Sequence, residues 1–193
     1  MIRAGLKVVL VLAIVALGSV ASTGEEFDFA CGRFAIVHST NGKCLTVDGD
    51  HLHDAGATIY LDEYKGLDSQ LWLIQSSSLG GYVIYNQASW MAMIVDYATE
   101  AQSGANIKQY HYQGHARQRW NLQILHESPI GPTIAITRVE NDRSEFGIVP
   151  EVHPSGWTNA VQIEVPWIQP TTTSNTTHSD PRFLWYFFFV PAP

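Results

Sequence analysis

The sequence contains few basic residues. Its 193 residues include 11 Lys and Arg against 18 Asp and Glu, so the net charge is −7 at pH 7. Nucleic acids and anionic membranes bind clusters of positive charge. We therefore expect neither of them to be a partner of this protein.

Signatures of the common enzyme classes are missing as well. His-Glu-x-x-His, Gly-x-Ser-x-Gly, Cys-x-x-Cys and a Gly-rich phosphate loop do not occur. His126-Glu127 begins a metalloprotease pattern, but Ser128-Pro129 breaks it. Acidic and histidine side chains gather at residues 48–54 without the spacing of a known metal site. The sequence therefore predicts a protein that is not an enzyme and needs no metal or other cofactor.

No apolar run is long enough to cross a membrane as a helix. The run at residues 8–17 is shorter than the 18 or more residues that a span needs. Arg3 and Lys7 precede it and Ser19-Val20-Ala21 follow it, which is typical of a signal peptide. We interpret residues 1–21 as a signal peptide, with a retained membrane anchor as the alternative, and residues 22–32 as an N-terminal extension. The mature protein is then secreted and extracellular, with no membrane span.

Cysteine is scarce, because Cys31 and Cys44 are the only two in the chain. Since a secreted protein matures in an oxidising compartment, we predict a disulfide between them, with two buried free thiols as the alternative. Residues 166–181 are rich in Thr and Ser and are typical of a long loop. This loop holds the one N-glycosylation acceptor of the sequence, Asn175-Thr176-Thr177, so we predict a glycan on Asn175.

A duplicated unit accounts for most of the chain after residue 32. Residues 34–75 align without a gap to the sequence 48 positions further on, with eleven identities, where unrelated segments would share roughly two or three. The identical pairs are Ile36/Ile84, Val47/Val95, Asp48/Asp96, Gly56/Gly104, Ala57/Ala105, Ile59/Ile107, Tyr64/Tyr112, Gly66/Gly114, Gln70/Gln118, Trp72/Trp120 and Gln75/Gln123. A degraded third unit begins near Thr133 and ends at Trp185. We call the three units, about residues 33–78, 79–128 and 129–193, copy one, copy two and copy three.

Each copy has the pattern of four strands. Runs of β-branched and aromatic residues, such as 34–37 and 82–85, alternate with turns, and no window sustains the apolar period of a helix. Three four-stranded units can close around a threefold axis, whereas a solenoid exposes both of its ends. The sequence therefore predicts one all-β domain, residues 33–193, with pseudo-threefold symmetry and almost no helix.

Two closing motifs, Gln70-Leu71-Trp72 and Gln118-Arg119-Trp120, resemble the Gln-x-Trp repeats of the ricin B-like lectins. The opening segments 34–37 and 42–45 resemble the entry hairpin of the same family. Copy three keeps Trp185 but has Phe183 where the other copies have Gln. The resemblance covers residues 33–193 and looks closest to the secreted fungal members. It implies a β-trefoil that binds glycans or glycoproteins.

The resemblance also implies where a sugar would bind in copy two. In the family an aromatic residue lies at the end of the third strand, an Asp lies near the end of the second, and an Asn or Gln precedes the closing Trp. Together they supply a ring face and hydrogen-bonding groups. Copy two has Tyr110, Asp96 and Gln118 at these places, with His111 at the rim.

Copies one and three match this pattern less well. Copy one offers Asp48, Asp62, Tyr64 and Gln70, and copy three has Glu164 at the aromatic position. We therefore expect weak or partly lost glycan sites, of which copy two is the best.

Purely structural roles for these residues, and a second function for the protein, also fit the sequence. The family's usual Asp position holds Thr46 in copy one and Ile94 in copy two, and the acidic residue follows two positions later. The three closing Trp residues are expected in the core, and the two Gln residues fit a structural role as well as a binding one. A protein target is the alternative partner, for a trefoil such as a protease inhibitor that acts through loop 166–181.

Overall fold

The computed structural model describes residue 29 and residues 32–99, 104–128, 130–139, 146–152, 158–164 and 181–191. The predicted signal peptide, Cys31, Asn175 and all of loop 166–181 except Pro181 lie outside these residues. The described strands are β1 (Arg33–His38), β2 (Cys44–Val47), β3 (Ile59–Asp62), β4 (Trp72–Ser76), β5 (Tyr82–Asn86), β6 (Ala92–Val95), β7 (Ala105–Tyr110), β8 (Trp120–Ser128), β9 (Gly131–Arg138), β10 (Phe146–Val152), β11 (Thr158–Glu164) and β12 (Trp185–Val190). Short 3₁₀ turns are the only helical elements within the described part of the chain.

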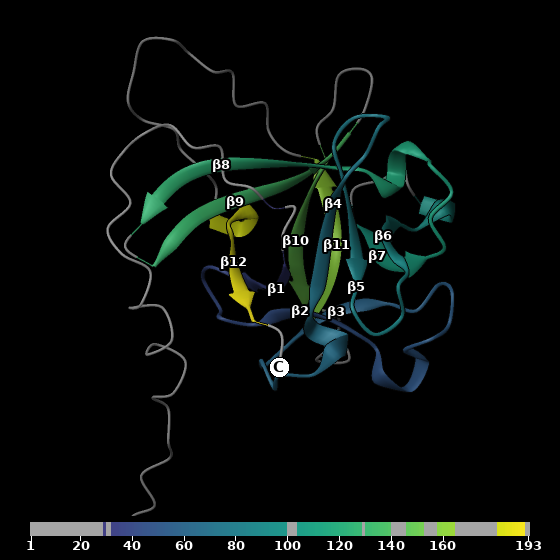
Figure 1. Ribbon diagram of the computed structural model, residues 1–193, viewed down its shortest axis with the longest axis horizontal. Helices are drawn as coiled ribbons and strands as arrows, with labels where there is room; N and C mark the ends of the chain where they lie inside the picture. The colour runs from purple at the N-terminus through teal and green to yellow at the C-terminus, as the bar shows by residue number, and fades with distance from the viewer. Residues whose placement is uncertain are drawn as a thin grey trace, which may run out of the picture.

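Six strands form a closed barrel. The antiparallel pairs run β1–β4, β4–β5, β5–β8, β8–β9, β9–β12 and β12–β1. The last pair joins the two ends of the domain over the whole of β1, from Arg33 opposite Val190 to His38 opposite Trp185. Figure 1 shows β12 beside β1 in this closure. Because the barrel closes on itself, its strands have no free edge.

The other six strands form three hairpins, one in each copy. They are β2–β3, β6–β7 and β10–β11. Strand β11 pairs with β3 at one position and with β7 at two, and these pairings join the hairpins to one another. A six-stranded barrel covered by three hairpins is a β-trefoil, so the predicted all-β fold with threefold symmetry is confirmed.

The closing tryptophans repeat one contact three times. Trp72, Trp120 and Trp185 are completely buried, as predicted. The indole nitrogen of each donates a hydrogen bond to the backbone of its own hairpin, at 3.0 Å to Leu45, 3.2 Å to Met93 and 3.0 Å to Ile148. The three rings therefore anchor the hairpins to the barrel in the same way.

This contact also corrects the register expected for copy three. Ile148 pairs with Gln162 as Met93 pairs with Gln109, so Ile163 occupies the place of Tyr110. Glu164, which we predicted there, lies one residue further along β11. The sequence alignment missed this because the degraded third copy offers few identities through its hairpin.

The predicted disulfide is not formed, because Cys44 is a free, buried thiol. Cys44 pairs with Val37, and the strand from there back to Arg33 spans about 13 Å. A disulfide joins Cα atoms within about 7 Å, so the start of β1 lies beyond the reach of a disulfide from Cys44. Burial raises the pKa of the Cys44 thiol to about 11, and its Sγ donates to the Asp62 carbonyl at 3.4 Å. The alternative prediction of a buried free thiol therefore holds for Cys44.

Candidate functional site

A pocket of about 350 Å³ lies on the outer face of hairpin β6–β7 in copy two. Its described lining consists of Gly56, Ile94, Val95, Asp96, Tyr97, Lys108, Tyr110, Gln113 and Arg117. All but Gly56 come from copy two. We call this cavity the copy-two pocket. Two of the predicted binding residues, Asp96 and Tyr110, share it.

Strand pairing explains how β7 presents its side chains. Ala105, Ile107 and Gln109 are buried, and the residues between them point outward by the period of two. Lys108 therefore lies opposite Ile94, and Tyr110 opposite Ala92, on the outer face of the hairpin. The Tyr110 side chain is 39% exposed, and its ring meets the predicted rim residue His111 edge to face at 5.9 Å. The ring is thus open to a ligand from the pocket.

The Asp96 carboxylate is held in a defined orientation. It accepts from Lys108 Nζ at 2.7 Å, across the hairpin, and from the backbone nitrogen of Ala98 at 3.4 Å. The hydrogen bond from Lys108 lowers the pKa of Asp96, against a smaller opposing effect of burial. Asp96 is therefore ionised at neutral pH and accepts hydrogen bonds inside the pocket.

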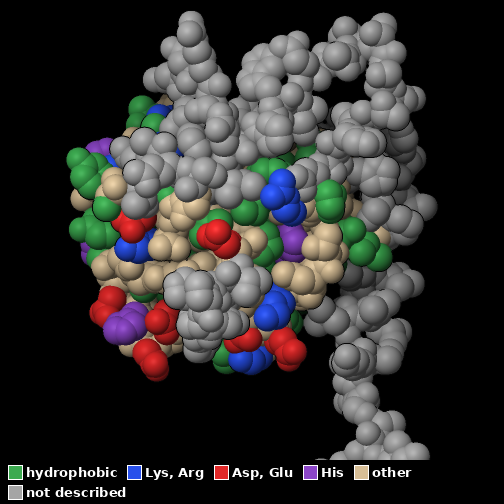
Figure 2. Space-filling model, turned by 180° about the vertical axis from the view of Figure 1, so that it is seen from behind, with side chains coloured by type: hydrophobic (Ala, Val, Ile, Leu, Met, Phe, Trp, Pro, Cys, Tyr) green, Lys and Arg blue, Asp and Glu red, His purple; other side chains and the backbone are tan. Residues whose placement is uncertain are grey.

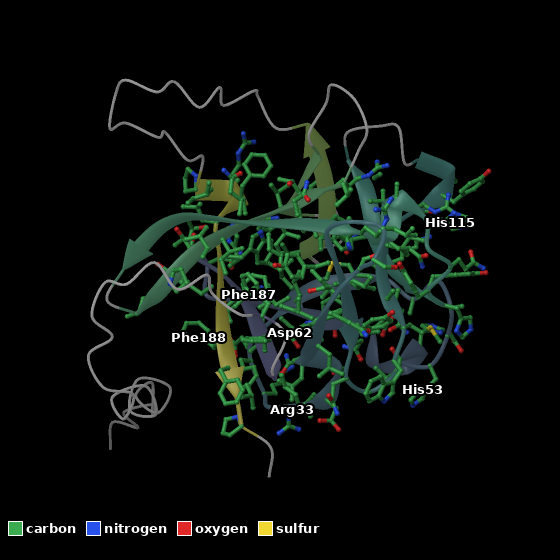
Figure 3. The ribbon with its side chains drawn as sticks, turned by 45° about the horizontal axis from the view of Figure 1, so that its top comes forward. Arg33, His53, Asp62, His115, Phe187 and Phe188 are labelled. Atoms are coloured by element: carbon green, nitrogen blue, oxygen red, sulfur yellow. The ribbon has the colours of Figure 1, made fainter. Side chains whose placement is uncertain are left out.

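A second ring lines the pocket directly after Asp96. Tyr97 opens the 3₁₀ turn η3 (Tyr97–Thr99), and the guanidinium of Arg117 lies 4.3 Å from the centre of its ring. Arg117 belongs to η4 (Ala116–Gln118), and Figure 3 labels His115 where the chain enters this turn. Cation–π contact of this kind joins η3 to η4.

The predicted Gln118 does not reach the pocket. It is completely buried, donates to the His111 carbonyl at 2.7 Å and accepts from the Gln113 backbone nitrogen at 2.7 Å. Gln70 repeats this clamp in copy one, with the Glu63 carbonyl at 2.8 Å and the Lys65 nitrogen at 2.7 Å. Both amides therefore hold the loop before the closing Trp, which is the structural role that the sequence left open.

Copy one has the same hairpin without the same lining. Asp48 accepts from the Asp50 backbone nitrogen at 3.2 Å, and Asp62 pairs with Lys65 at 2.5 Å at the opposite end of β2–β3. The Tyr64 side chain packs against the buried cluster of Ala35, Val37, Cys44 and Leu71, and burial raises its pKa. Copy one therefore has Asp62 instead of an aromatic ring at the position of Tyr110, and the ring of its Tyr64 is used in packing.

Four aromatic, charged or amide side chains of the pocket were not predicted as binding residues: Tyr97, Lys108, Gln113 and Arg117. The period of β7 could have identified Lys108, which lies two residues before Tyr110 on the same face. Tyr97 and Arg117 meet only through tertiary contact between two turns. Among the described residues, no three His, Cys, Asp or Glu side chains are grouped closely enough to hold a metal ion. Within the same residues, no helix has the length and apolar character of a membrane span.

Residues 23–110 match the model of a protein family described as ricin-type β-trefoil lectin domain-like. The resemblance to the ricin B-like lectins is confirmed. The matched segment includes all of copy one and extends through Tyr110 of copy two. A closer relationship to the fungal members stays a prediction.

Solved structures with this fold are similar to the chain at low sequence identity. The designed threefold-symmetric protein ThreeFoil is 22% identical with a TM-score of 0.61, over 83% of this chain and 100% of that one. A ricin B-like lectin of Macrolepiota procera in complex with lactose is 12% identical with a TM-score of 0.54, over 88% and 98%. An exo-β-1,3-galactanase from Clostridium thermocellum is 20% identical with a TM-score of 0.61, over 82% of this chain and 30% of that one. No curated protein matches the sequence.

Proposed function

We propose that this protein is a secreted lectin that binds carbohydrate in the copy-two pocket. The observation that carries the proposal is that an exposed ring, Tyr110, and an ionised carboxylate, Asp96, line one open cavity at opposite ends of hairpin β6–β7. The ring can stack on the apolar C–H face of a sugar, and Asp96 can accept from hydroxyls of the glycan at the other end of the pocket. Lys108 and Gln113 add donors from the same lining.

We infer one working site rather than three. At the places of Tyr110, Tyr97 and Arg117, copy one has Asp62, Gly49 and Ser69. Copy three has Ile163 at the place of Tyr110. Neither copy has an aromatic residue at the position of Tyr110, which supports weak or lost binding there.

The pocket favours binding over catalysis. Asp96 is the one acidic side chain among the described residues that line it, and Lys108 holds it as an anion. Glycoside hydrolysis generally uses two carboxyl groups, one of which donates a proton. On the face shown in Figure 2, Lys, Arg, Asp and Glu side chains lie interspersed among other residues. A surface on which charges are interspersed in this way suits recognition of an uncharged sugar by a ring and a few hydrogen bonds.

The proposal includes secretion, the signal peptide and a glycan on Asn175, and only the sequence supports these three features. The alternative of a protease inhibitor depends on loop 166–181. Since only Pro181 of this loop is described, no contact of the loop supports that function.

A glycan array tests the proposal. The mature protein and its Tyr110→Ala variant are applied to the same array, with Tyr112→Phe as a folded control whose ring lies outside the pocket lining. We expect the wild type and the control to bind a common set of glycans and Tyr110→Ala to lose that set. Absence of binding by the folded wild type would contradict the proposed function.

A further inference from the structure

The two exposed tyrosines of the copy-two pocket stand at opposite ends of the hairpin. Tyr110 lies opposite Ala92 at the start of β6, and Tyr97 follows Asp96 beyond the end of the same strand. The rise along β6 from Ala92 to Asp96 is about 13 Å. Ile94 and Lys108 pair with each other and line the pocket between these two ends of the hairpin. One sugar ring cannot stack on both tyrosines across this distance.

The Tyr97 ring has the exposure and the restraint that a stacking surface for a sugar needs. Its side chain is 71% exposed although it lines the pocket, and Arg117 lies 4.3 Å from its ring centre. This contact restrains the ring before any ligand binds, which lowers the ordering cost of binding.

The other two copies act as internal comparisons. Copy one has Gly49 in place of Tyr97 and Ser69 in place of Arg117. Copy three has Val152 and Arg182 at the corresponding positions, so it has the cation without the ring. The ring and the guanidinium occur together only in copy two, in the same copy as Tyr110.

We propose that Tyr97, restrained by Arg117, is a second sugar platform, so that the copy-two pocket takes two consecutive sugar rings, one on Tyr110 and one on Tyr97. The ligand class is therefore a disaccharide or the end of a longer glycan. The volume of about 350 Å³ suits such a fragment, since it lies near the lower end of the range of about 300–1,000 Å³ for small-molecule pockets. This inference rests on the proposed function and names the ligand class of the same pocket.

Titration calorimetry with matched sugars tests the inference. The probes are galactose with lactose and N-acetylglucosamine with chitobiose, together with the terminal monosaccharide and disaccharide of the strongest array ligand. We expect the wild type to bind the better disaccharide about tenfold more tightly than its monosaccharide. Tyr97→Ala should lose this gain and leave monosaccharide binding within about twofold. Tyr110→Ala should weaken both ligands.

Two variants separate the ring from its surroundings. Tyr97→Phe keeps the ring, so it should bind the disaccharide like the wild type. Arg117→Ala removes the restraint, so it should lose part of the disaccharide gain while the thermal midpoint shows that the domain is folded.

Each outcome decides a different claim. If the wild type binds both sugars of a pair equally, or if Tyr97→Ala binds the disaccharide as tightly as the wild type, the second platform is wrong and the lectin function stands. If the folded wild type binds no glycan on the array, both the function and the second platform are wrong.

Discussion

Copies one and two differ where a ligand would bind and agree where the fold is held together. Both place a completely buried Trp against the hairpin, and both clamp the preceding loop with a buried Gln. At the pocket, by contrast, Tyr110 and Arg117 of copy two correspond to Asp62 and Ser69 of copy one. The positions that maintain the trefoil are therefore separate from those that shape the pocket. Function can be gained or lost in one copy without disturbing the fold.

The largest expected effect concerns the shared anchors. Trp72→Ala and Trp120→Ala should each lower the free energy of unfolding by about 3–5 kcal/mol, because each leaves a large cavity and an unpaired backbone carbonyl. Chemical denaturation measures both variants. A cost below about 1 kcal/mol in either copy would contradict the equivalence of the two anchors.

The buried Gln clamps should show a smaller effect that differs between the copies. Gln70 also donates to Thr46 Oγ1 at 3.2 Å, whereas copy two has Ile94 at that position. We expect Gln70→Ala to cost about 2–3 kcal/mol and Gln118→Ala about 2 kcal/mol in unfolding experiments.

The same two variants should differ in their effect on glycan binding. Gln118 holds the backbone of Gln113, which lines the pocket, so Gln118→Ala should weaken glycan binding. Gln70→Ala should leave it unchanged. Equal effects of the two variants on the array would contradict a single site in copy two.

Removal of the pocket ring should weaken binding without unfolding the domain. Tyr110→Ala is expected to reduce glycan affinity by about 1–3 kcal/mol, a factor of about 5 to 150, because the stacking face is lost. Asp62→Ala is the matched change in copy one and should leave affinity unaltered. Titration calorimetry measures both, and wild-type affinity in Tyr110→Ala would move the site elsewhere.

The β5–β6 turn offers a comparison of backbone strain. Trp90 has a φ of 58° and is 66% exposed, at the position where copy one has Gly42 with a φ of 68°. Glycine adopts this conformation without the steric cost that other residues bear. Trp90→Gly should therefore stabilise the protein by about 1 kcal/mol, and Gly42→Ala should destabilise it by a similar amount. Thermal unfolding of both variants checks the signs, and a loss of stability in Trp90→Gly would show that its ring makes compensating contacts.

The smallest effect at neutral pH concerns the Asp96–Lys108 pair. Because the hydrogen bond from Lys108 lowers the pKa of Asp96 in the folded protein, its contribution to stability is complete above the unfolded pKa of about 4. That contribution is lost as the pH falls through the lower folded value. Lys108→Met removes the cause of the lowered pKa, so Asp96 should become protonated at a higher pH. Glycan binding should then be lost at a higher pH than in the wild type when the solution is acidified. The pH dependence of binding by wild type and Lys108→Met measures this, and identical profiles would exclude Lys108 as the cause.

Much of the fold could be predicted because the repeated units of the threefold fold can be recognised in the sequence. Trp72 and Trp120 recur at a fixed interval, and strand periodicity places each of them in the core. The register of copy three could not be predicted, since its hairpin keeps too few identities to locate Ile163. The predicted disulfide was wrong for Cys44, because the prediction depended on an oxidising compartment and took no account of the length of β1.

The site divides in the same way. The family pattern selected Asp96 and Tyr110, and both line the pocket. It also selected Gln118, whose side chain turns inward because the backbone of its own loop takes both ends of the amide. Tyr97 and Arg117 were not predicted as binding residues, because copy one has Gly49 and Ser69 at their positions.

The sequence by itself determined the strand period, the three copies and the buried anchors, because these depend on local alternation and on the spacing of apolar residues. The tertiary structure decided which polar side chains face outward together. Whether Asp96 meets Lys108, and whether Tyr97 meets Arg117, depends on how hairpin β6–β7 packs beside the loop before Trp120. Contacts between segments distant in the chain leave no period in the sequence, so the pocket emerged only from the folded protein.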